Sequence, residues 1–230
     1  MTSLPTTRTL QSLAETKELI TTDQFIELVE QDINEARYSH AELIDGIVVM
    51  NAAVGRYHGR PQQIIATWLG NYEIATEGVE SFPSVSLVLD RTNMLEPHAC
   101  LRITDEYGGA SKGDQYVRGP AELVVEISVS SVDRDLGSKK NNYEQSGVLE
   151  YLVWRVEEGE FDYFSLTNGK FAPQAVTIGV LKSKIFGGLW LDVAAALRLD
   201  IRGVMKTLEA GVSSPDHEAF VTSMNLRKRN

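Results

Sequence analysis

The segment AELVVEIS, residues 121–128, most constrains how this chain can fold. Apart from Glu126, every residue from 123 to 127 is Leu, Val or Ile, and so apolar a run is typical of a central strand covered on both faces. Burying a carboxylate there costs on the order of several kcal/mol unless a cation, a metal or hydrogen-bond donors meet it, so we expect Glu126 to have a partner. Strand alternation could instead aim Glu126 at solvent or at a structural arginine, and the pattern alone leaves both interpretations open.

The segments around this strand predict an α/β fold, in which helices can cover both faces of one sheet. Asp45-Gly46 and Asn168-Gly169 each lie between β-prone runs and predict hairpins, the first over 41–51, because glycine tolerates positive φ. Further strands are predicted over 84–90, 98–103 and 150–156, a surface loop over 104–120, and helices over 21–32, 60–75 (with Pro61 in its first turn), 136–146, 189–197, 204–211 and 215–224.

The length of 230 residues suits one domain, predicted over 21–225, with a mobile N-terminal segment at 1–20 and a polar tail at 226–230. Cys100 is the only cysteine, which excludes an internal disulfide and fits a reducing compartment, so we expect the cytoplasm. No window approaches the roughly 18 consecutive apolar residues that a membrane span requires, so we expect no membrane partner.

The charge balance bears on partners. The chain carries 22 basic and 32 acidic residues, a net charge of −10. Such a balance repels polyanions at long range, so any contact with nucleic acid must be local. A small basic surface that includes Arg102, Arg134, Lys139 and Lys140 could provide that contact.

Most familiar catalytic fingerprints are absent, among them the phosphate-binding GxxxxGK[ST], the dinucleotide GxGxxG, the nucleophile elbow GxSxG, HExxH and CxxC. What remains is Glu126. In an antiparallel neighbour, His98 at the start of HACLRI could lie alongside it, and a helix after the central strand could return Lys139 to the same end. A carboxylate and a further ligand can hold a divalent cation against a phosphate, with a lysine steadying the nucleophile or the developing charge, which is the chemistry of phosphodiester hydrolysis.

Several stretches in order carry a family resemblance. The run PAELVVEISVSSVDRDLGSKKNNYEQSGVLEYLVW, together with YSHAELIDGIVVMNAAVGRYHG, IFGGLWLDVAAAL and SPDHEAFV, resembles the Uma2 family (DUF820) of the PD-(D/E)XK nuclease superfamily over roughly residues 22–225. The resemblance implies a restriction-endonuclease-like α/β/α core with a mixed central sheet, an N-terminal hairpin, and a C-terminal β-hairpin and helices. It also implies a divalent metal at the ends of the central strands.

Carried over by position, the resemblance makes Glu126 the metal-binding acid of the central strand. Ser128 stands where the superfamily usually has a lysine, and Lys139 from the following helix takes over that role. Asp135 is expected to support the metal ligands without touching the metal. Glu42 and His58 also match family positions. A hairpin ion pair for Glu42, and a helix-entry cap or exposed side chain for His58, remain open as alternatives.

The first motif departs from the family pattern. Where the family has a Pro-Asp pair, this chain has Pro97-His98. Neutral imidazole is a softer donor than carboxylate, so we expect Mn²⁺ or a softer ion to be favoured over Mg²⁺. Glu96 could supply an oxygen, but alternation is expected to place it on a different face unless the proline bends the chain. We expect His40 and His217 to be surface residues.

Two functions therefore stay open. The first is a metal-dependent nuclease that hydrolyses DNA through a metal-activated water, with His98, Glu126 and Lys139 as catalytic residues. The second is a catalytically decayed nuclease-fold protein that binds or regulates. Hydrolysis of another phosphodiester is a weaker third possibility, because a fold does not fix a substrate. A duplex cutter is expected to form a homodimer, since two strands need two sites.

Overall fold

The computed structural model describes residues 8–35, 40–51, 55–175 and 179–228. Its central sheet has the strand order β12-β11-β10-β9-β6-β3. In this sheet β9 and β10 run parallel while the other neighbours are antiparallel, so the sheet is mixed, as the sequence predicts. The strands are β3 (Val79–Phe82), β6 (Ala99–Ile103), β9 (Leu123–Ser128), β10 (Glu150–Arg155), β11 (Glu160–Thr167) and β12 (Lys170–Pro173).

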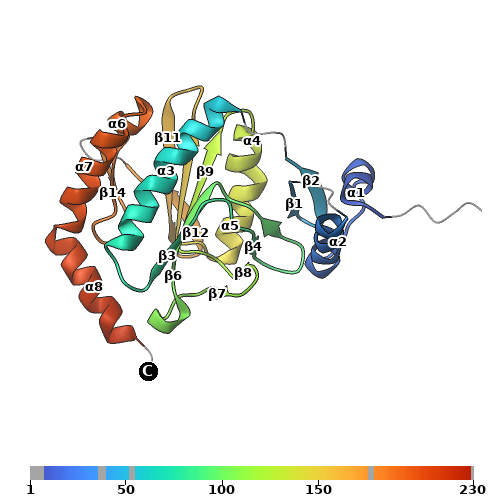
Figure 1. Cartoon of the computed structure of the whole chain (residues 1–230), viewed down its shortest axis with the longest axis horizontal. Coiled ribbons are helices and arrows are strands. Elements are labelled where there is room, and N and C mark those ends of the chain that lie inside the picture. Colours follow the sequence, from blue (N-terminus) through green and yellow to red (C-terminus); the bar gives the residue numbers. More distant parts are fainter. Residues whose placement is uncertain (1–7, 36–39, 52–54, 176–178, 229–230) are drawn as a thin grey trace, which may run out of the picture.

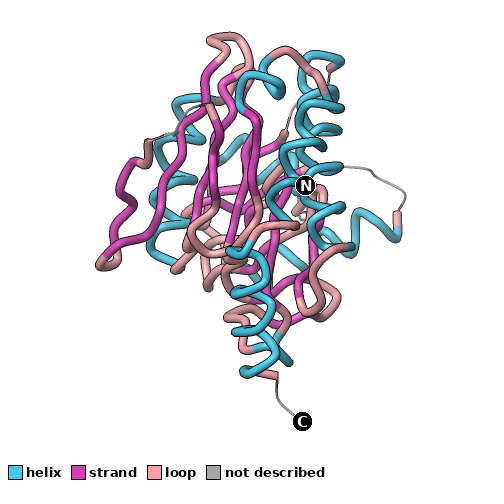
Figure 2. The backbone as a smooth tube through the Cα atoms, turned by 90° about the vertical axis from the view of Figure 1, so that its left-hand side faces the viewer, coloured by secondary structure: helices cyan, strands magenta, loops and turns pink. Residues whose placement is uncertain are grey.

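Helices cover both faces of this sheet (Figures 1 and 2). One face of β9, with Leu123, Val125 and Ile127, joins a core cluster with α3 (Arg56–Ile74), α6 (Val193–Leu197), α7 (Ile201–Val212) and α8 (Pro215–Arg227). The other face of β9, with Val124, packs against Tyr143 of α5 (Lys140–Ser146). Because Glu126 is two residues from Val124, it points toward α5 within the protein. The α/β/α arrangement is confirmed.

A second sheet lies beside the first and was not expected from the sequence. Its strand order is β2-β1-β5-β4-β8-β7. The hairpin predicted over 41–51 forms its edge, with Asp45 and Gly46 both at positive φ. The strand predicted over 84–90 shrinks to two residues of this sheet, and the predicted loop 104–120 contains two of its strands and a 3-10 turn, η1 (Asp105–Tyr107). The strands are β1 (Ala41–Ile44), β2 (Ile47–Met50), β4 (Leu87–Val88), β5 (Met94–Leu95), β7 (Lys112–Gly113) and β8 (Val117–Arg118).

The helices differ from the sequence prediction at their ends. Helix α3 begins at Arg56, so Pro61 lies inside it and not in its first turn. The helix predicted over 189–197 is shorter because β14 (Trp190–Asp192) pairs with β13 (Val180–Lys182), and the Asp192 side chain then caps α6 at the Ala195 N–H. Helix α2 (Thr22–Asn34) starts near the predicted residue, and α4 (Val132–Arg134) with a π-helical turn (Asp135–Lys139) precedes α5.

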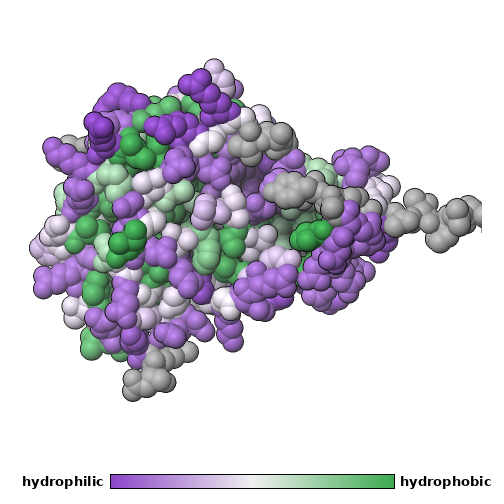
Figure 3. All heavy atoms as spheres, in the orientation of Figure 1, coloured by the Kyte–Doolittle hydropathy of each residue, from purple (hydrophilic) through white to green (hydrophobic). Residues whose placement is uncertain are grey.

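Part of the N-terminal segment 1–20 is a packed helix. Helix α1 (Leu10–Thr16) buries Leu10 and Leu13 in a cluster with the hairpin. Residues 1–7 and the last two residues of the polar tail lie outside the described residues, and the single domain over 21–225 stays a prediction. Among the described helices, none has the length and apolar character to cross a bilayer. Hydrophilic residues cover most of the described surface on the face in Figure 3.

Candidate active site

The side chain of Glu126 lies at the centre of a buried polar cluster. It is 0% exposed, and both of its oxygens have partners. Lys139 Nζ lies 2.8 Å from Oε1, and the Tyr143 hydroxyl donates to the same oxygen at 3.1 Å. His98 Nδ1 contacts Oε2. The interpretation that Glu126 would meet a cation and donors is therefore confirmed, and the solvent-facing alternative is wrong.

Two features of the backbone bring these side chains together. Strand β6 is antiparallel to β9 with Ala99 opposite Val125, so His98, one residue before, falls beside Glu126. After β9 the chain forms a π-helical turn that contains Gly137 at φ −103° and ψ −106°, outside the helical region. This kink precedes Lys139, whose side chain returns to β9. The expected meeting of residues 98, 126 and 139 is thus observed.

Glu42 of β1 completes the buried cluster. Lys139 Nζ lies 2.8 Å from Glu42 Oε1 as well as from Glu126, and both side chains of the pair are 1% exposed. The same Glu42 oxygen accepts the backbone N–H of Glu96 at 2.8 Å. Glu42 is therefore a hairpin residue paired with a lysine, and that lysine is the candidate catalytic one.

Charge and burial set the protonation of the cluster. Burial alone would raise the pKa of Glu126, but the Lys139 charge and the His98 contact outweigh burial and hold that pKa well below its ordinary value. Burial would lower the pKa of Lys139, yet the carboxylates of Glu126, Glu42 and Asp135 raise it overall. The cluster thus contains an ammonium beside the ionised carboxylate of Glu126, and Lys139 stays protonated at neutral pH.

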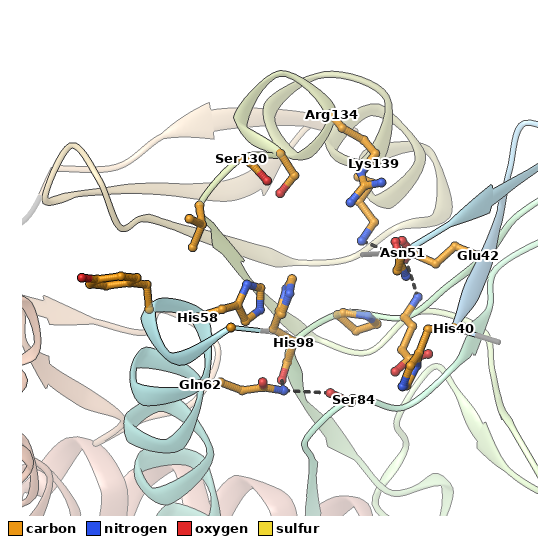
Figure 4. A pocket seen from close by; sticks show the side chains of 16 residues that line it. His40, Glu42, Asn51, His58, Gln62, Ser84, His98, Ser130, Arg134 and Lys139 are labelled. Carbon is orange, nitrogen blue, oxygen red and sulfur yellow. Dashed lines mark hydrogen bonds and ion pairs between the residues drawn. The ribbon is translucent and has the colours of Figure 1, made fainter. Parts of the chain in front are cut away.

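A cavity of about 320 Å³ adjoins this cluster, and Glu42, His98 and Lys139 are among the residues that line it (Figure 4). The rings of His58, from the first turn of α3, and His98 lie side by side in it, with centroids 4.3 Å apart. Burial and the neighbouring His98 lower the pKa of His58 to about 4, so its ring is neutral at pH 7. Glu96 lines the cavity with His98, which corrects the expected placement, because residues 96 and 97 lie outside any strand and the chain bends at residue 98, so strand alternation does not apply there.

Side-chain polar atoms without a hydrogen-bond partner gather at this cavity. In the described part of the chain, four buried atoms of this kind occur: Asn51 Oδ1, His58 Nε2, Arg134 Nε and Asp135 Oδ1. The first three belong to residues that line the cavity. Buried polar groups are nearly always satisfied, so their concentration here marks the place where a ligand would bind. Sequence reasoning missed Asn51 as a site residue.

Asp135 lies next to the cluster but shares no hydrogen bond with Glu126. The Ser131 hydroxyl donates to its Oδ2 at 2.5 Å, and burial, with the Glu126 charge, raises the pKa of its carboxyl. Its position, beside Arg134 and behind the lysine, fits the expected supporting role.

The expected basic surface does not form as one patch. Arg102 is only 3% exposed, where it binds Glu80 across the sheet and the carbonyl of Ser111, and Lys139 is buried as described above. Lys140 lies over the ring of Phe164. His217, expected on the surface, is buried with its ring against Thr76 Oγ1 at 2.9 Å.

The donors present fit a divalent cation in chemical type, because carboxylates of Glu42 and Glu96 and imidazoles of His58 and His98 line one cavity, and Glu126 lies buried in contact with His98. Among the described residues, however, no three such side chains converge as a ready-made ligand set. Mg²⁺ and Mn²⁺ sites at phosphates commonly take only one or two protein ligands and complete their coordination with water and substrate, so the number of donors does not exclude such a cation.

Fold and site together define an α/β protein of the nuclease-like class, with a buried acid on the central strand and a lysine from the next helix. The Uma2 family, described as "Putative restriction endonuclease", matches residues 23–194, and the chain belongs to this family. A solved structure described as a putative nuclease belonging to DUF820, from Anabaena variabilis, is similar at 11% identity and a TM-score of 0.63. That similarity covers 78% of this chain and 98% of the other, and it supports the restriction-endonuclease-like fold. No curated protein matches the chain.

Proposed function

We propose that the chain is a metal-dependent nuclease that hydrolyses phosphodiester bonds of DNA, with His98, Glu126 and Lys139 as its catalytic residues. The observation that carries this proposal is the meeting of these three side chains, from three separate segments, beneath one cavity with unpartnered polar atoms. A buried, ionised Glu126 and a permanently charged Lys139 are costly to maintain for stability alone, which favours a function for them.

Each of these residues has a separate proposed role, which follows from its position in the site. A divalent cation held at the His98 and Glu126 end of the cavity, Mn²⁺ or a softer ion in preference to Mg²⁺, would polarise the phosphate and lower the pKa of an attacking water. Lys139 keeps a positive charge beside that point and orients the water. Glu42 fixes the ammonium from the other side. Arg134 lines the cavity, and its Nε makes no hydrogen bond but lies 4.0 Å from Asp135 Oδ1, so the rest of its guanidinium would contact a phosphate oxygen.

The second candidate is a decayed nuclease-fold protein that binds or regulates. One observation favours it. The Lys139 side chain is 1% exposed and its ammonium is bound by two carboxylates, so the polar cluster is also stable as an ion network without a ligand. The histidine at position 98, where the family pattern has an aspartate, also favours this second candidate.

Plasmid nicking separates these functions. Supercoiled DNA is incubated with wild type, Glu126→Gln, His98→Asp and the exposed control Glu157→Gln, each with Mg²⁺ or Mn²⁺, after their thermal unfolding has been compared. Nicking by wild type and Glu157→Gln that Glu126→Gln abolishes supports the nuclease. If wild type does not nick the plasmid and His98→Asp does, the site of the wild-type chain is a decayed nuclease site. Equal nicking by Glu126→Gln and wild type refutes the mechanism.

We further propose that the chain acts on DNA as a homodimer in the cytoplasm. Two strands of a duplex need two sites, and a buried, unpaired Cys100 suits a reducing compartment. Light scattering of the purified chain with and without a DNA duplex tests the assembly, and a monomer in both samples contradicts it.

A further inference from the structure

Tyr57 is an exposed aromatic residue at the cavity of the candidate active site. It is 81% exposed, and it lines the same cavity as His98. Among the large hydrophobic residues that are exposed in the described structure, Tyr57 is the only aromatic one. Single exposed apolar residues are ordinary on protein surfaces. This one differs from an ordinary surface residue because a substrate that enters the cavity would meet its ring.

The fold anchors the backbone of Tyr57 and leaves its side chain free. Tyr57 belongs to the first turn of α3, where the backbone N–H groups of His58 and Gly59 donate to the Gly55 carbonyl. Further along the same helix, Trp68 is fully buried in the core. Neither the ring nor the hydroxyl of Tyr57 has a partner among the residues that the structure describes. Its ring is therefore held at the cavity wall without a contact of its own.

The charge of the protein makes a ring at this place useful for binding nucleic acid. The chain carries a net charge of −10, and Arg102 and Lys139, two of the expected basic surface residues, form ion pairs inside the protein. Phosphate contacts by lysine and arginine usually supply a large share of the affinity, so this protein needs a further source of binding free energy. Stacking of a base on an aromatic ring is such a source, and it does not depend on the net charge.

Polar groups for the rest of a nucleotide lie around the same cavity. His58, the residue after Tyr57, has a buried Nε2 without a hydrogen-bond partner in the described structure. In Figure 4, His58 at the end of α3 and Arg134 of α4 lie on different sides of the cavity. A nucleotide whose phosphate lies in this cavity can reach Tyr57 with its base only if that base is unpaired. In an intact duplex the faces of each base are covered by its neighbours in the stack.

We propose that Tyr57 stacks on an unpaired base of the substrate strand, beside the phosphate that the cavity holds. The site therefore prefers single strands, frayed ends and locally opened DNA over intact duplex, because a paired base must first leave its stack at a cost in free energy. Tyr57 contributes binding and specificity and takes no part in bond cleavage. This inference deepens the proposed function by naming the substrate class of the same site, and it rests on that function for the choice of DNA.

The test is equilibrium binding of the full-length chain to short fluorescent DNA probes in EDTA, where no metal-dependent cleavage occurs. Three probes of equal length are compared: a single strand, a blunt duplex, and a single strand in which every base is replaced by an abasic site. Wild type should bind the single strand about 5–150-fold more tightly than the abasic strand, the range that stacking of one base contributes. The intact duplex should bind more weakly than the single strand.

The variants separate stacking from other contacts. Tyr57→Ala should bind the single strand as weakly as wild type binds the abasic strand, and it should no longer distinguish the two probes. Tyr57→Phe should keep the wild-type preference, whereas Tyr57→Leu, which has apolar area but no aromatic face, should lose most of it. Ile74→Ala is the matched control, because Ile74 lies at the other end of α3 and is 84% exposed. Unfolding curves verify that each variant is folded.

Four results would overturn the inference. They are the absence of DNA binding by wild type, equal binding of the single strand by wild type and Tyr57→Ala, a wild-type preference in Tyr57→Leu, and tighter binding of the intact duplex than of the single strand.

Failure of the proposed function looks different. A chain that shows the Tyr57-dependent preference but does not nick DNA with Mg²⁺ or Mn²⁺ retains the base contact and loses the nuclease. Nicking that Glu126→Gln abolishes, together with equal strand binding by wild type and Tyr57→Ala, retains the nuclease and refutes the base contact.

Discussion

Replacing Lys139 with methionine, which has a similar length and no charge, should destabilise the protein strongly. In the folded protein its Nζ lies 2.8 Å from the Oε1 atoms of both Glu42 and Glu126, and all three side chains are at most 1% exposed. Without the lysine, the carboxyl groups of Glu42 and Glu126 remain buried with no ammonium between them. Removing one partner of a buried ion pair costs about 3–5 kcal/mol, because a buried charge is left uncompensated.

The assay is urea and thermal unfolding at pH 7 in the absence of metal. For a chain of this size about 1 kcal/mol corresponds to about 2–4 °C in Tm, so the expected loss is about 6–20 °C. Lys140→Met is the matched control, because that neighbouring ammonium lies over the Phe164 ring at 4.2 Å, a contact worth about 0.5–1 kcal/mol when exposed.

A second variant tests the cause of the loss. In a Glu42→Gln background only one carboxylate, Glu126, depends on the ammonium, so Lys139→Met should cost less there than in wild type. A loss of stability in Lys139→Met no larger than that in Lys140→Met would refute the claim that Lys139 neutralises two buried carboxylates. Strictly additive losses in the double variant of Lys139→Met and Glu42→Gln would refute it too.

Two further predictions concern other parts of the fold. Gly211→Ala should destabilise the protein by about 1–3 kcal/mol or more, because an added Cβ would lie 2.1 Å from the carbonyl oxygen of Gly188. Gly59→Ala should instead stabilise it by about 0.5–1 kcal/mol, because Gly59 lies in helix α3 and its added Cβ would have no atom within 4 Å. Equal effects of the two substitutions on the free energy of urea unfolding would contradict this prediction. Burial lowers the pKa of His217 in the folded protein, so the unfolded state takes up the proton first and stability should fall as pH drops below 6.5. The dependence of Tm on pH should be shallower in His217→Gln, and an unchanged slope would contradict this assignment.

The central sheet and its buried acid could be predicted because their signals are local and strong. The apolar run around Glu126 marks a covered strand, and the antiparallel neighbour and the returning helix follow from the order of the elements. These rules suffice to bring His98 and Lys139 to Glu126. Glu42 was a candidate because it matches a family position, and a hairpin ion pair was the open alternative, but Lys139 could not be identified as its partner without the packing of β1 against the segment after β9.

The second sheet could not be predicted, for a physical reason. Four of its strands, β4, β5, β7 and β8, are two residues long, which is too short for any alternation of apolar and polar residues to appear. β4 pairs with β5 and β7 with β8 locally, but the pairing of β4 with β8 and of β5 with β1, which makes them one sheet, joins residues far apart in the chain. The same holds for Asn51, whose significance comes from an unpartnered atom at a cavity and not from its neighbours in sequence.

Histidine at position 98 changes how the cluster is held together. An aspartate there would place a second carboxylate against Glu126, and with Glu42 nearby the single ammonium of Lys139 would face three anions. Like charges in such contact raise one another's pKa or require a bound cation. His98 meets Glu126 with a ring nitrogen that can carry a proton, so the contact is attractive without metal. The substitution therefore does two things at once: it removes the need for a hard cation to neutralise the site, and it leaves an imidazole nitrogen that favours a softer one.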